Sequence, residues 1–546
     1  MPRVTEEAAR TGRLKRSVGF YGLMFVSLGS IIGSGWLLGA LNAAKEAGPA
    51  SIISWLLAAA MLSLLALTYA ELGASYPVAG GPGRVPYYAH GPVAGFTAGW
   101  AGWLQAVFIA PVEVLAAINY INSVTWVHEH FNMMSEGLLN HTGVLVAVAM
   151  MVVFTAINLA GAKFLADSNV GVVIWKAIIP FLAAITIASM RFNAANFHGG
   201  GGFMPKGFHG VFAALTGGVV FALQGFEQGV QLAGEARNPK KDVARAILVA
   251  MAIGAVLYSL LQFVMIGAID PANIKEGWLA PLGTSVSAYG AWYTLALAVG
   301  AGWLAKLLLV DAVISPAGTG IVYVGTTARL SYSLGEEREI PSALTKTNAR
   351  GVPIVGVLVA ALIGCLAFGP FKSWKELVEV VTAATAIMYA FGPLSLAALH
   401  KLDPDRPRTY RAPMPRVLLP AAFCSANLII YWGGFATTWK LVVAMVVGLF
   451  LFFIGAIRVG TIGDAKMKSA LWMVPWLGGH VLIGALGRYG GGYNVLPAWV
   501  DLGVLIAFSL AIFYGALRMT LTAQDSATAI AKDAYQLEFT ATSHDA

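Results

Sequence analysis

The chain has 546 residues, of which 58% are hydrophobic and only 11% are charged. About a quarter of the residues in an average soluble protein are charged, so this chain lacks the residues to cover a soluble core of its size. Its mean hydropathy of +0.72 and its recurring long apolar runs exclude soluble enzymes, nucleic-acid-binding proteins and disordered scaffolds. The composition predicts a polytopic membrane protein, and runs without strict alternation favour helices over barrel strands.

Neither the net charge nor the two cysteines indicate a nucleic-acid partner, a disulfide or a metal site. The charge of +8 does not indicate nucleic acid, because the basic residues lie singly or in short clusters between apolar runs. Cys365 and Cys424 lie in apolar stretches without neighbouring ligands, so we expect no disulfide framework and no metal site. No spacing typical of catalytic residues stands out. We therefore expect no cofactor, no catalytic residue and no enzyme activity.

About fourteen apolar segments approach the length of roughly 20 residues that crosses a bilayer. The eighth is too long for one span, so we expect its C-terminal part to extend beyond the membrane. In the thirteenth, Trp472, Trp476 and His480 predict a partly interfacial helix. The segments lie near residues 17–40, 51–74, 96–123, 143–162, 168–190, 211–234, 246–268, 291–330, 352–370, 377–399, 416–434, 438–458, 469–487 and 500–520.

The distribution of basic residues predicts the orientation. Most of the 35 Lys and Arg residues fall in segments that share a side with the N-terminus, with clusters at 3–16, 237–245 and 401–416. Because cytoplasmic loops carry the excess of Lys and Arg, we expect both termini in the cytoplasm and the protein in the cell membrane. Residues 1–16 are polar and do not resemble a cleavable signal. The polar stretch 521–546 predicts a mobile cytoplasmic tail.

Two of the segments contain helix-breaking sequences near their middle. The first carries GSIIGSG (29–35), and each glycine costs a helix about 1 kcal/mol relative to alanine. The sixth carries FALQGFE (221–227), whose glutamine and glutamate require protein or water partners at bilayer depth. Either segment alone also fits close helix packing through small residues.

The pairing of the two segments favours a binding site. They are five segments apart, so they cross the membrane in opposite directions, as matching helices of two inverted repeats do. Interrupted helices at matching positions of such repeats indicate the midplane site of a transporter. Freed N–H groups can hold a carboxylate and freed carbonyls an ammonium, so the two breaks predict a site for a zwitterion.

At these residues the chain resembles the amino acid–polyamine–organocation superfamily of permeases. Within it, the chain resembles bacterial aspartate–proton symporters through GWLAKLLLVDAVISPAGTG (302–320) and two extra C-terminal spans. It departs from them at QGFEQ (224–228), which is similar to general amino acid permeases and puts the substrate in doubt. The superfamily resemblance covers residues 17–458 and is carried by GSIIGSGW (29–36), YAELGASYPVAGGPGRVPYYAHGPVAGFTAGW (69–100), INLAGAK (157–163), FALQGFEQGVQLAGEARNPKKDVARAI (221–247), TTARLSYSL…IP (326–341) and DPDRPRTYRAP (403–413).

The resemblance implies an all-α, LeuT-like five-plus-five inverted repeat that rocks between outward-open and inward-open states. Residues 17–190 would form the first repeat, residues 211–399 the second, and residues 416–520 about four additional helices. Segments 1–16 and 521–546 would be cytoplasmic. The implied substrate-binding residues flank the two breaks: Ser30, Ile31, Gly33, Ser34, Gly35, Phe221, Ala222, Gly225 and Phe226.

Three charged residues inside spans are candidates for proton coupling, because a charge at a helix centre costs about 2.5–3.5 kcal/mol. Lys176 either ties the fifth segment to carbonyls of the broken first segment or titrates near the substrate, where sodium-coupled relatives hold sodium. Glu227 either accepts hydrogen bonds from freed N–H groups or serves as a second proton site or gate sensor. For Asp311 we expect an ion pair with Lys176 or Lys306.

Three further carboxylates predict structural roles. Glu71 and Glu235 are expected to form interfacial salt bridges with Arg84 and Arg237, which would latch an inward gate. Glu113 is expected to be a structural residue of the third segment rather than a substrate contact.

The sequence therefore predicts a secondary active transporter that imports an amino acid by alternating access, coupled to protons, with aspartate or glutamate as candidate substrates. The expected partners are the amino acid, protons and the lipid bilayer, and no nucleic acid. An exchanger or a permease of broad or neutral range is the alternative. A channel or substrate sensor that does not pump is a more distant one.

Overall fold

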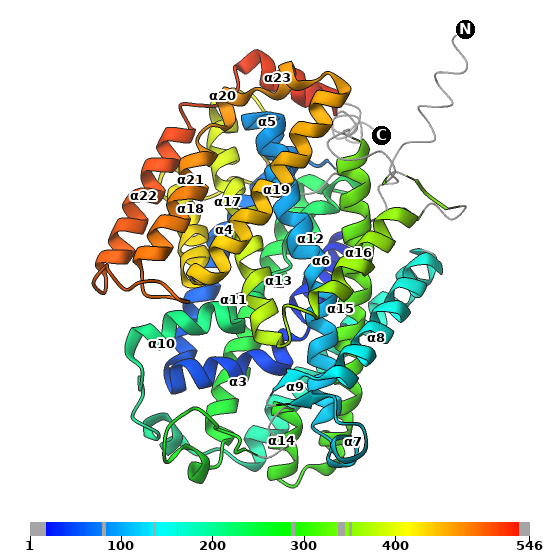
Figure 1. Cartoon of the computed structure of the whole chain (residues 1–546), viewed down its shortest axis with the longest axis vertical. Coiled ribbons are helices and arrows are strands. Elements are labelled where there is room, and N and C mark those ends of the chain that lie inside the picture. The colour runs from blue at the N-terminus through cyan, green and yellow to red at the C-terminus, as the bar shows by residue number, and fades with distance from the viewer. Residues whose placement is uncertain are drawn as a thin grey trace.

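The computed structural model describes residues 18–78, 83–135, 137–160, 162–284, 290–336, 344, 346–348 and 352–533, and the side chains of residues 162–170 are not described. Within these residues the chain is a bundle of helices (Figure 1). A short antiparallel hairpin joins β1 (Met134–Ser135) to β2 (Leu138–Leu139), with Met134 opposite Leu139. The segments 1–16 and 534–546, which the sequence predicts as cytoplasmic, lie outside the described residues.

Helix is present in each of the fourteen predicted segments. Among the described residues, eight helices are long and apolar enough to cross a membrane, or nine if one bent pair counts as a span. One of these stretches, Gly35–Ser75, contains both α3 (Gly35–Ala47) and α4 (Ser51–Ser75). The other seven lie in α6 (Pro92–Asn122), α8 (His141–Ala160), α9 (Ala162–Met190), α13 (Pro239–Ala268), α15 (Gly302–Glu336), α17 (Trp374–Leu402) and α19 (Phe435–Val459). The helix α18 (Pro415–Trp432) lies between α17 and α19 in the chain.

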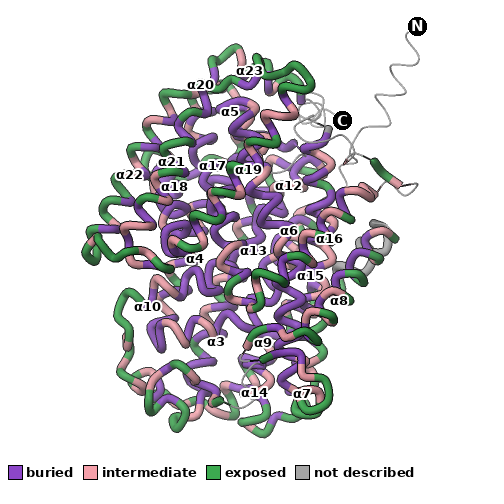
Figure 2. Tube along the Cα trace, in the orientation of Figure 1, coloured by how far each residue is buried: buried purple, intermediate pink, exposed green. Residues whose placement is uncertain are grey.

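The outer helices of the bundle expose large apolar side chains on their outward faces. Figure 2 shows a buried interior, with exposed positions distributed along the outer helices. Val256, Leu362 and Phe450 are 64%, 61% and 65% exposed. Soluble monomers do not expose apolar side chains on this scale, whereas lipid acyl chains solvate them. The chain is therefore a multi-pass membrane protein.

The break expected in the first segment is present. Helix α2 (Phe20–Ile31) ends at Ile31 and α3 begins at Gly35, with residues 32–34 outside both helices. Ile32 leaves the helical conformation, at φ −90° and ψ 85°. The glycines and serines of this stretch stabilise a helix poorly, so the chain turns here at little cost.

The sixth segment is interrupted twice. It comprises α10 (Gly207–Ala214), a π-helical turn η4 (Leu215–Val219), α11 (Val220–Leu223) and α12 (Glu227–Gln231). Gly218 in the turn has a φ of 139°, which favours glycine. Gln224 is extended and Gly225 has a φ of 114°, so the helix stops between α11 and α12 as the sequence predicts.

The two broken segments lie against each other through their glycines. A Cβ on Gly35 would lie 2.6 Å from the Cβ of Ala222, and a Cβ on Gly225 would lie 2.8 Å from the Cβ of Ser30. Either distance is shorter than two carbon atoms tolerate, so only glycine allows this approach. The two breaks therefore face one another inside the bundle, which α4, α6, α13, α15 and α17 complete.

The long eighth segment consists of two helices. Helix α14 (Ala291–Ala298) is separated from α15 by Gly300, whose φ is 79°. The 35 residues of α15 extend about 50 Å, more than the hydrocarbon thickness of a bilayer. In Figure 1, α14 lies at the lower end of the bundle, and α5 (Arg84–His90) lies at the upper end. We call these the α14 end and the α5 end.

The thirteenth segment, for which the sequence predicts a partly interfacial helix, is buried among other helices. Helices α20 (Met467–Ala470) and α21 (Met473–Leu486) form a bent pair that packs among α18, α19 and α22 (Val500–Ala516). Trp472, Trp476 and His480 are at most 2% exposed. Trp476 Nε1 and His480 Nε2 lie 2.9 and 2.8 Å from Asn427 Oδ1 of α18, so a neighbouring helix supplies a partner for these two nitrogens.

The prediction of a mobile tail is wrong for residues 523–532. They form α23 (Ala523–Lys532), which packs on α5. The hydroxyl of Thr522 caps the helix by accepting a hydrogen bond from the N–H of Asp525 at 3.1 Å. The helix buries small residues, Ser526 and Ala529, and docks through polar contacts. Hydropathy does not detect such an interface.

Candidate functional site

The first break is held by a carboxylate from α6. Glu113 accepts a hydrogen bond from the N–H of Ser34 at 2.8 Å and another from the Ser34 hydroxyl at 3.1 Å. Its carboxylate also lies against Gly33, where a Cβ would come within 2.7 Å of Oε1. Glu113 thus binds the freed N-terminus of α3, where an anion is favoured. Sequence reasoning underrated this residue, although a single glutamate deep in a 31-residue helix was the available signal.

The N-terminus of α17 covers the same break. Trp374 donates a hydrogen bond from Nε1 to the Ser34 hydroxyl at 3.1 Å. Its ring also packs edge-on against Phe221, with 5.8 Å between ring centroids. Trp374 thus touches both broken segments, Ser34 in the first and Phe221 in the sixth. Nothing in the local sequence around Trp374 indicated this contact.

The carbonyls freed at the first break also have partners. The hydroxyl of Tyr258 donates to the Ile31 carbonyl at 2.8 Å. Lys176 Nζ lies 3.2 Å from the Gly29 carbonyl and 2.5 Å from the Thr319 hydroxyl, and Lys176 is only 2% exposed. Lys176 thus contacts a carbonyl of the broken first segment, as the structural interpretation predicts, and joins α9 to α2 and α15.

The second break carries a buried carboxylate of its own. Glu227 Oε2 accepts hydrogen bonds from the N–H of Gly225 at 3.1 Å and from the hydroxyl of Tyr389 in α17. Phe226 stacks on Tyr389 with 4.8 Å between ring centroids. The prediction that Glu227 binds a freed N–H group is confirmed. Its Oε1 is buried and has no hydrogen-bond partner among the described residues.

Asp311 is bound by two tryptophan side chains. Its carboxylate accepts hydrogen bonds from the indole N–H groups of Trp175 at 2.7 Å and Trp36 at 3.1 Å. No ion pair within 4.0 Å joins it to Lys176 or Lys306 in the described part of the chain. The expected ion pair is therefore wrong, because two indole donors from neighbouring helices satisfy this carboxylate.

Several buried polar side chains, at the second break and on α6 and α17, have no hydrogen-bond partner among the described residues. Gln224 is 7% exposed, and neither polar atom of its amide has a hydrogen-bond partner among the described residues. The amide nitrogen of Gln105 in α6 and the hydroxyl of Thr382 in α17 are also buried without one. Buried polar atoms in native proteins are nearly always paired, so these groups indicate a place for water or a polar ligand.

A cavity leads from the α5 end of the bundle to Glu227. It is lined by residues of α4, α5, α12 and α17 and encloses about 530 Å³, counting its open mouth. Arg84, Val85 and Pro86 of α5 line it, as do Tyr69 and Glu227. The second break is thus reachable from the α5 end.

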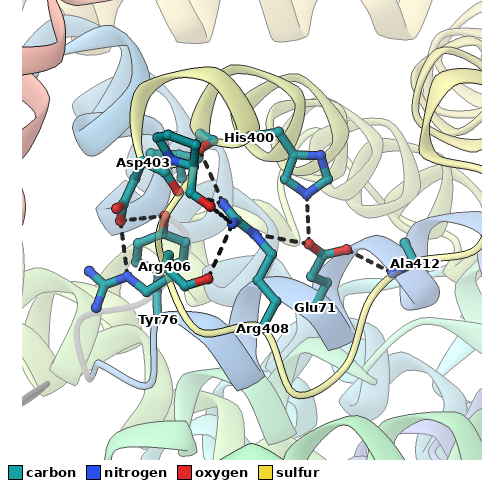
Figure 3. Close-up of polar contacts among 9 residues, drawn as sticks. Glu71, Tyr76, His400, Asp403, Arg406, Arg408 and Ala412 are labelled. Carbon is teal, nitrogen blue, oxygen red and sulfur yellow. Dashed lines mark hydrogen bonds and ion pairs between the residues drawn. The ribbon is translucent and has the colours of Figure 1, made fainter.

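A cluster of charged residues lies between α4 and the loop after α17 (Figure 3). Glu71 of α4 is fully buried, and its Oε1 lies 2.6 Å from His400 Nε2 and 3.4 Å from Arg408 Nε. Its Oε2 accepts a hydrogen bond from the N–H of Ala412 at 2.7 Å. The expected pairing of Glu71 with Arg84 is wrong, because the loop after α17 folds back over α4 and supplies other partners.

The same loop is fixed at a second point. Asp403 Oδ2 accepts hydrogen bonds from Tyr76 and from Arg406 Nε, both at 3.0 Å. The guanidinium of Arg406 lies 4.7 Å from the ring centroid of Tyr76 (Figure 3). The Pro- and Arg-rich stretch is therefore a structured loop that covers the C-terminal end of α4.

The structure brings most of the predicted site residues together. The substrate-binding candidates lie at two breaks in contact, Lys176 adjoins the first break, and Glu227 adjoins the second. Asp311 contacts Trp36, which directly follows the site candidate Gly35. The residues that the prediction missed are Glu113, Trp374 and Tyr389.

Comparison with known proteins identifies the family. The sequence pattern of the amino acid permease family matches residues 18–454. The chain is 34% identical over 508 residues to the glutamate/serine transporter AimA of Bacillus subtilis (strain 168), covering 92% of this chain and 93% of that protein. It is 30% identical over 514 residues to the aspartate-proton symporter of the same strain, covering 93% and 97%. It is 27% identical over 467 residues to the branched-chain amino acid permease BcaP of that strain, covering 82% and 95%.

These matches confirm the superfamily and the fold class that the motifs implied. The protein is all-α and polytopic, with the LeuT-like fold of two inverted repeats, and it transports amino acids rather than catalysing a reaction. The chain belongs to the amino acid permease family.

Proposed function

We propose that the protein is a secondary active transporter that carries an amino acid across the cell membrane by alternating access, coupled to protons. The observation that supports this best is the contact between two broken helices, with Lys176, Glu113 and Glu227 buried at the breaks. Buried ionisable groups beside freed backbone groups are typical of sites that bind a charged substrate and a coupling ion.

The proposed site uses both breaks. Gly33, Ser34 and Gly35 would bind the α-carboxylate at the N-terminus of α3, and the carbonyls of Ser30 and Ile31 would face the ammonium. From the sixth segment, Phe221, Ala222, Gly225 and Phe226 would close the pocket. Lys176, Glu227 and Asp311 are the candidates for proton transfer that the sequence indicates, and we add Glu113 to them.

Glu113 offers a physical reason for coupling. Its carboxylate now binds the Ser34 N–H that a substrate carboxylate would use, so the two anions compete. A proton on Glu113 weakens its hold on that N–H and removes the repulsion between the two carboxylates. Proton binding would thus prepare the site for the substrate.

The proposed orientation places the α5 end in the cytoplasm. The Thr409 hydroxyl donates to the Lys240 carbonyl at 2.7 Å, so the basic clusters 237–245 and 401–416 lie at the same end. Such clusters favour the cytoplasmic side. In this arrangement residues 17–190 and 211–399 would be the two repeats and 416–520 the extra helices. Residues 1–16 and 521–546 would be cytoplasmic.

The proposed substrates are acidic and small polar amino acids. The relatives named above include a glutamate/serine transporter and an aspartate-proton symporter, each matching more than nine-tenths of this chain. The unpaired amide of Gln224 offers donors to a side-chain carboxylate or hydroxyl.

The first experiment identifies the ligand by thermal stability. Purified protein is heated with each of the twenty amino acids and common polyamines, because a ligand that binds only the folded state raises the unfolding temperature. We expect glutamate, aspartate or serine to stabilise the protein. The absence of a shift with these three would contradict the proposed substrate class.

The second experiment tests coupling. In proteoliposomes, we expect a pH gradient that is acidic outside to drive uptake until the internal substrate concentration exceeds the external one. Substrate loaded inside the liposomes, without a pH gradient, should not drive such accumulation. Lys176→Ala should abolish this uptake while folding survives, whereas Lys306→Ala, the substitution of an exposed lysine in α15, should not. Uptake driven only by internal substrate would identify an exchanger instead.

A further inference from the structure

The segment that follows the family match has no part in the proposed site. The family pattern ends at residue 454, and α20, α21, α22 and α23 lie beyond it. In Figure 1, α20 and α23 lie at the upper end of the bundle, next to α5. Helix α5 in turn follows α4 and forms one wall of the cavity that reaches Glu227.

Helix α23 binds α5 through its C-terminal end. Asp533 is 5% exposed, and its Oδ2 accepts a hydrogen bond from Tyr88 at 2.6 Å and lies 3.4 Å from Arg84 Nη1. Lys532 Nζ donates to the Tyr87 hydroxyl at 3.0 Å. Two consecutive residues of the tail thus bind three residues of α5.

The opposite end of α5 is bound as well. The Leu521 N–H donates to the Ala89 carbonyl at 3.0 Å, and the Ser469 hydroxyl donates to the His90 carbonyl at 2.6 Å. These bonds take up carbonyls that the C-terminus of a helix leaves free. Gly91, which ends α5 at a φ of 85°, packs against Ser469 and Leu521.

A salt bridge joins the two segments that bind α5, the one before α20 and α23. Lys466, just before α20, lies 3.0 Å from Asp525 of α23. We define the clasp as the residues that bind α5 or join its two arms: Lys466, Ser469, Leu521, Asp525, Lys532 and Asp533. Both arms originate from the segment outside the family pattern.

The helix that the clasp binds, α5, also forms one side of the mouth of the cavity. Arg84, Val85 and Pro86 line the cavity, and Arg84 binds Asp533 of the clasp at the same time. Any widening of the mouth on this side has to move α5 and therefore has to break clasp contacts. The contacts of Asp533 resist this most strongly, because a buried carboxylate loses hydrogen bonds that water does not already compete for.

We propose that the clasp is a brake that holds α5 against the cavity and limits how far it opens at the α5 end. The proposal rests on the proposed function only in assigning that opening to substrate release. All residues of the clasp lie beyond the part of the chain that matches the family pattern.

Accessibility of the cavity tests the brake without any transport measurement. Val230 of α12 lines the cavity, and the chain has only two cysteines, Cys365 and Cys424. A Val230→Cys variant lacking both native cysteines is placed in lipid nanodiscs and labelled with a membrane-impermeant maleimide. We expect Asp533→Asn to raise the labelling rate at least threefold. The substitution of an exposed α23 residue, Gln524→Ala, should leave the rate unchanged.

A second variant controls for the possibility that Asp533→Asn changes labelling by misfolding the protein. A chain that ends after Thr522 removes α23, and its gel-filtration profile and helical content report whether the bundle stays folded. We expect this chain to label at least as fast as Asp533→Asn. Equal labelling rates in the truncated chain, Asp533→Asn and Gln524→Ala would overturn the brake. Because no substrate is present, this result stands apart from failure of the proposed transport.

Discussion

Glu113 of α6 binds Ser34 at the first break with both carboxylate oxygens, one on the backbone N–H and one on the hydroxyl. The two residues are 79 positions apart in the chain. This contact fills the position in which the N-terminus of α3 favours an anion. If the substrate binds at this break as proposed, its carboxylate has to displace Glu113 from Ser34.

Replacing this carboxylate tests the competition directly. Glu113→Gln keeps the shape of the side chain but removes its charge and its ability to take up a proton. We expect substrate binding, measured by thermal shift, to persist and to lose its dependence on pH. Accumulation driven by a pH gradient should fall at least tenfold. The exposed Glu129→Gln is the control, and accumulation by Glu113→Gln at the wild-type rate would refute the role of Glu113.

The bond between Tyr389 and Glu227 is expected to stabilise the second break. Tyr389→Phe removes the hydroxyl donor but keeps the ring that stacks on Phe226. Loss of a hydrogen bond to a buried charged group costs about 1–3 kcal/mol, so the unfolding temperature should fall. In a double-mutant cycle with Glu227→Gln we expect a coupling energy of about 0.5–3 kcal/mol. Additive effects would show that the two residues do not interact, and Tyr514→Phe is an exposed control.

The close approach of the two breaks depends on Gly35. In Gly35→Ala the new methyl group would lie 2.6 Å from the Cβ of Ala222, so the broken segments have to move apart. We expect a loss of about 1–3 kcal/mol of stability, as overpacking in cores costs, together with loss of the substrate-induced thermal shift. Gly171→Ala in α9 is the control, because a Cβ there meets nothing within 4 Å. A normal substrate response in Gly35→Ala would contradict the proposed site.

An exposed ion pair outside the membrane gives a prediction for pH. The pKa of Asp270, in the loop after α13, is lowered because Arg191 donates a hydrogen bond to it at 2.8 Å. A lowered pKa means that the charged carboxylate stabilises the folded state above the ordinary pKa of 3.8, and that this contribution is lost as the pH falls further.

Thermal unfolding of Asp270→Asn measures this contribution. Exposed ion pairs contribute about 0.2–1 kcal/mol, so the variant should unfold at a slightly lower temperature than the wild type. We expect the difference to be constant between pH 8 and 5 and to shrink only below about pH 4. A difference that already disappears by pH 5 would show that Arg191 does not hold the carboxylate in its charged form.

The sequence alone determined the spans and the two breaks, because hydropathy and glycine content act over a few neighbouring residues. The GSIIGSG stretch interrupts its helix for reasons contained within it, and the bonds of Lys176 to a carbonyl and of Glu227 to an N–H follow from the cost of burying a charge. The motifs also identified the family, which the comparisons then confirmed.

Only the tertiary structure decided which partners meet at the site. Trp374 reaches Ser34 across 340 positions, and Asp311 takes two indole donors in place of the lysines that lie near it in the sequence or in an adjacent span. The docking of α23 could likewise not be predicted from the sequence. Its small and polar residues contribute to stability only through their contacts with α5, which is distant in the chain. Such contacts depend on how helices pack in three dimensions, and no local pattern encodes that arrangement.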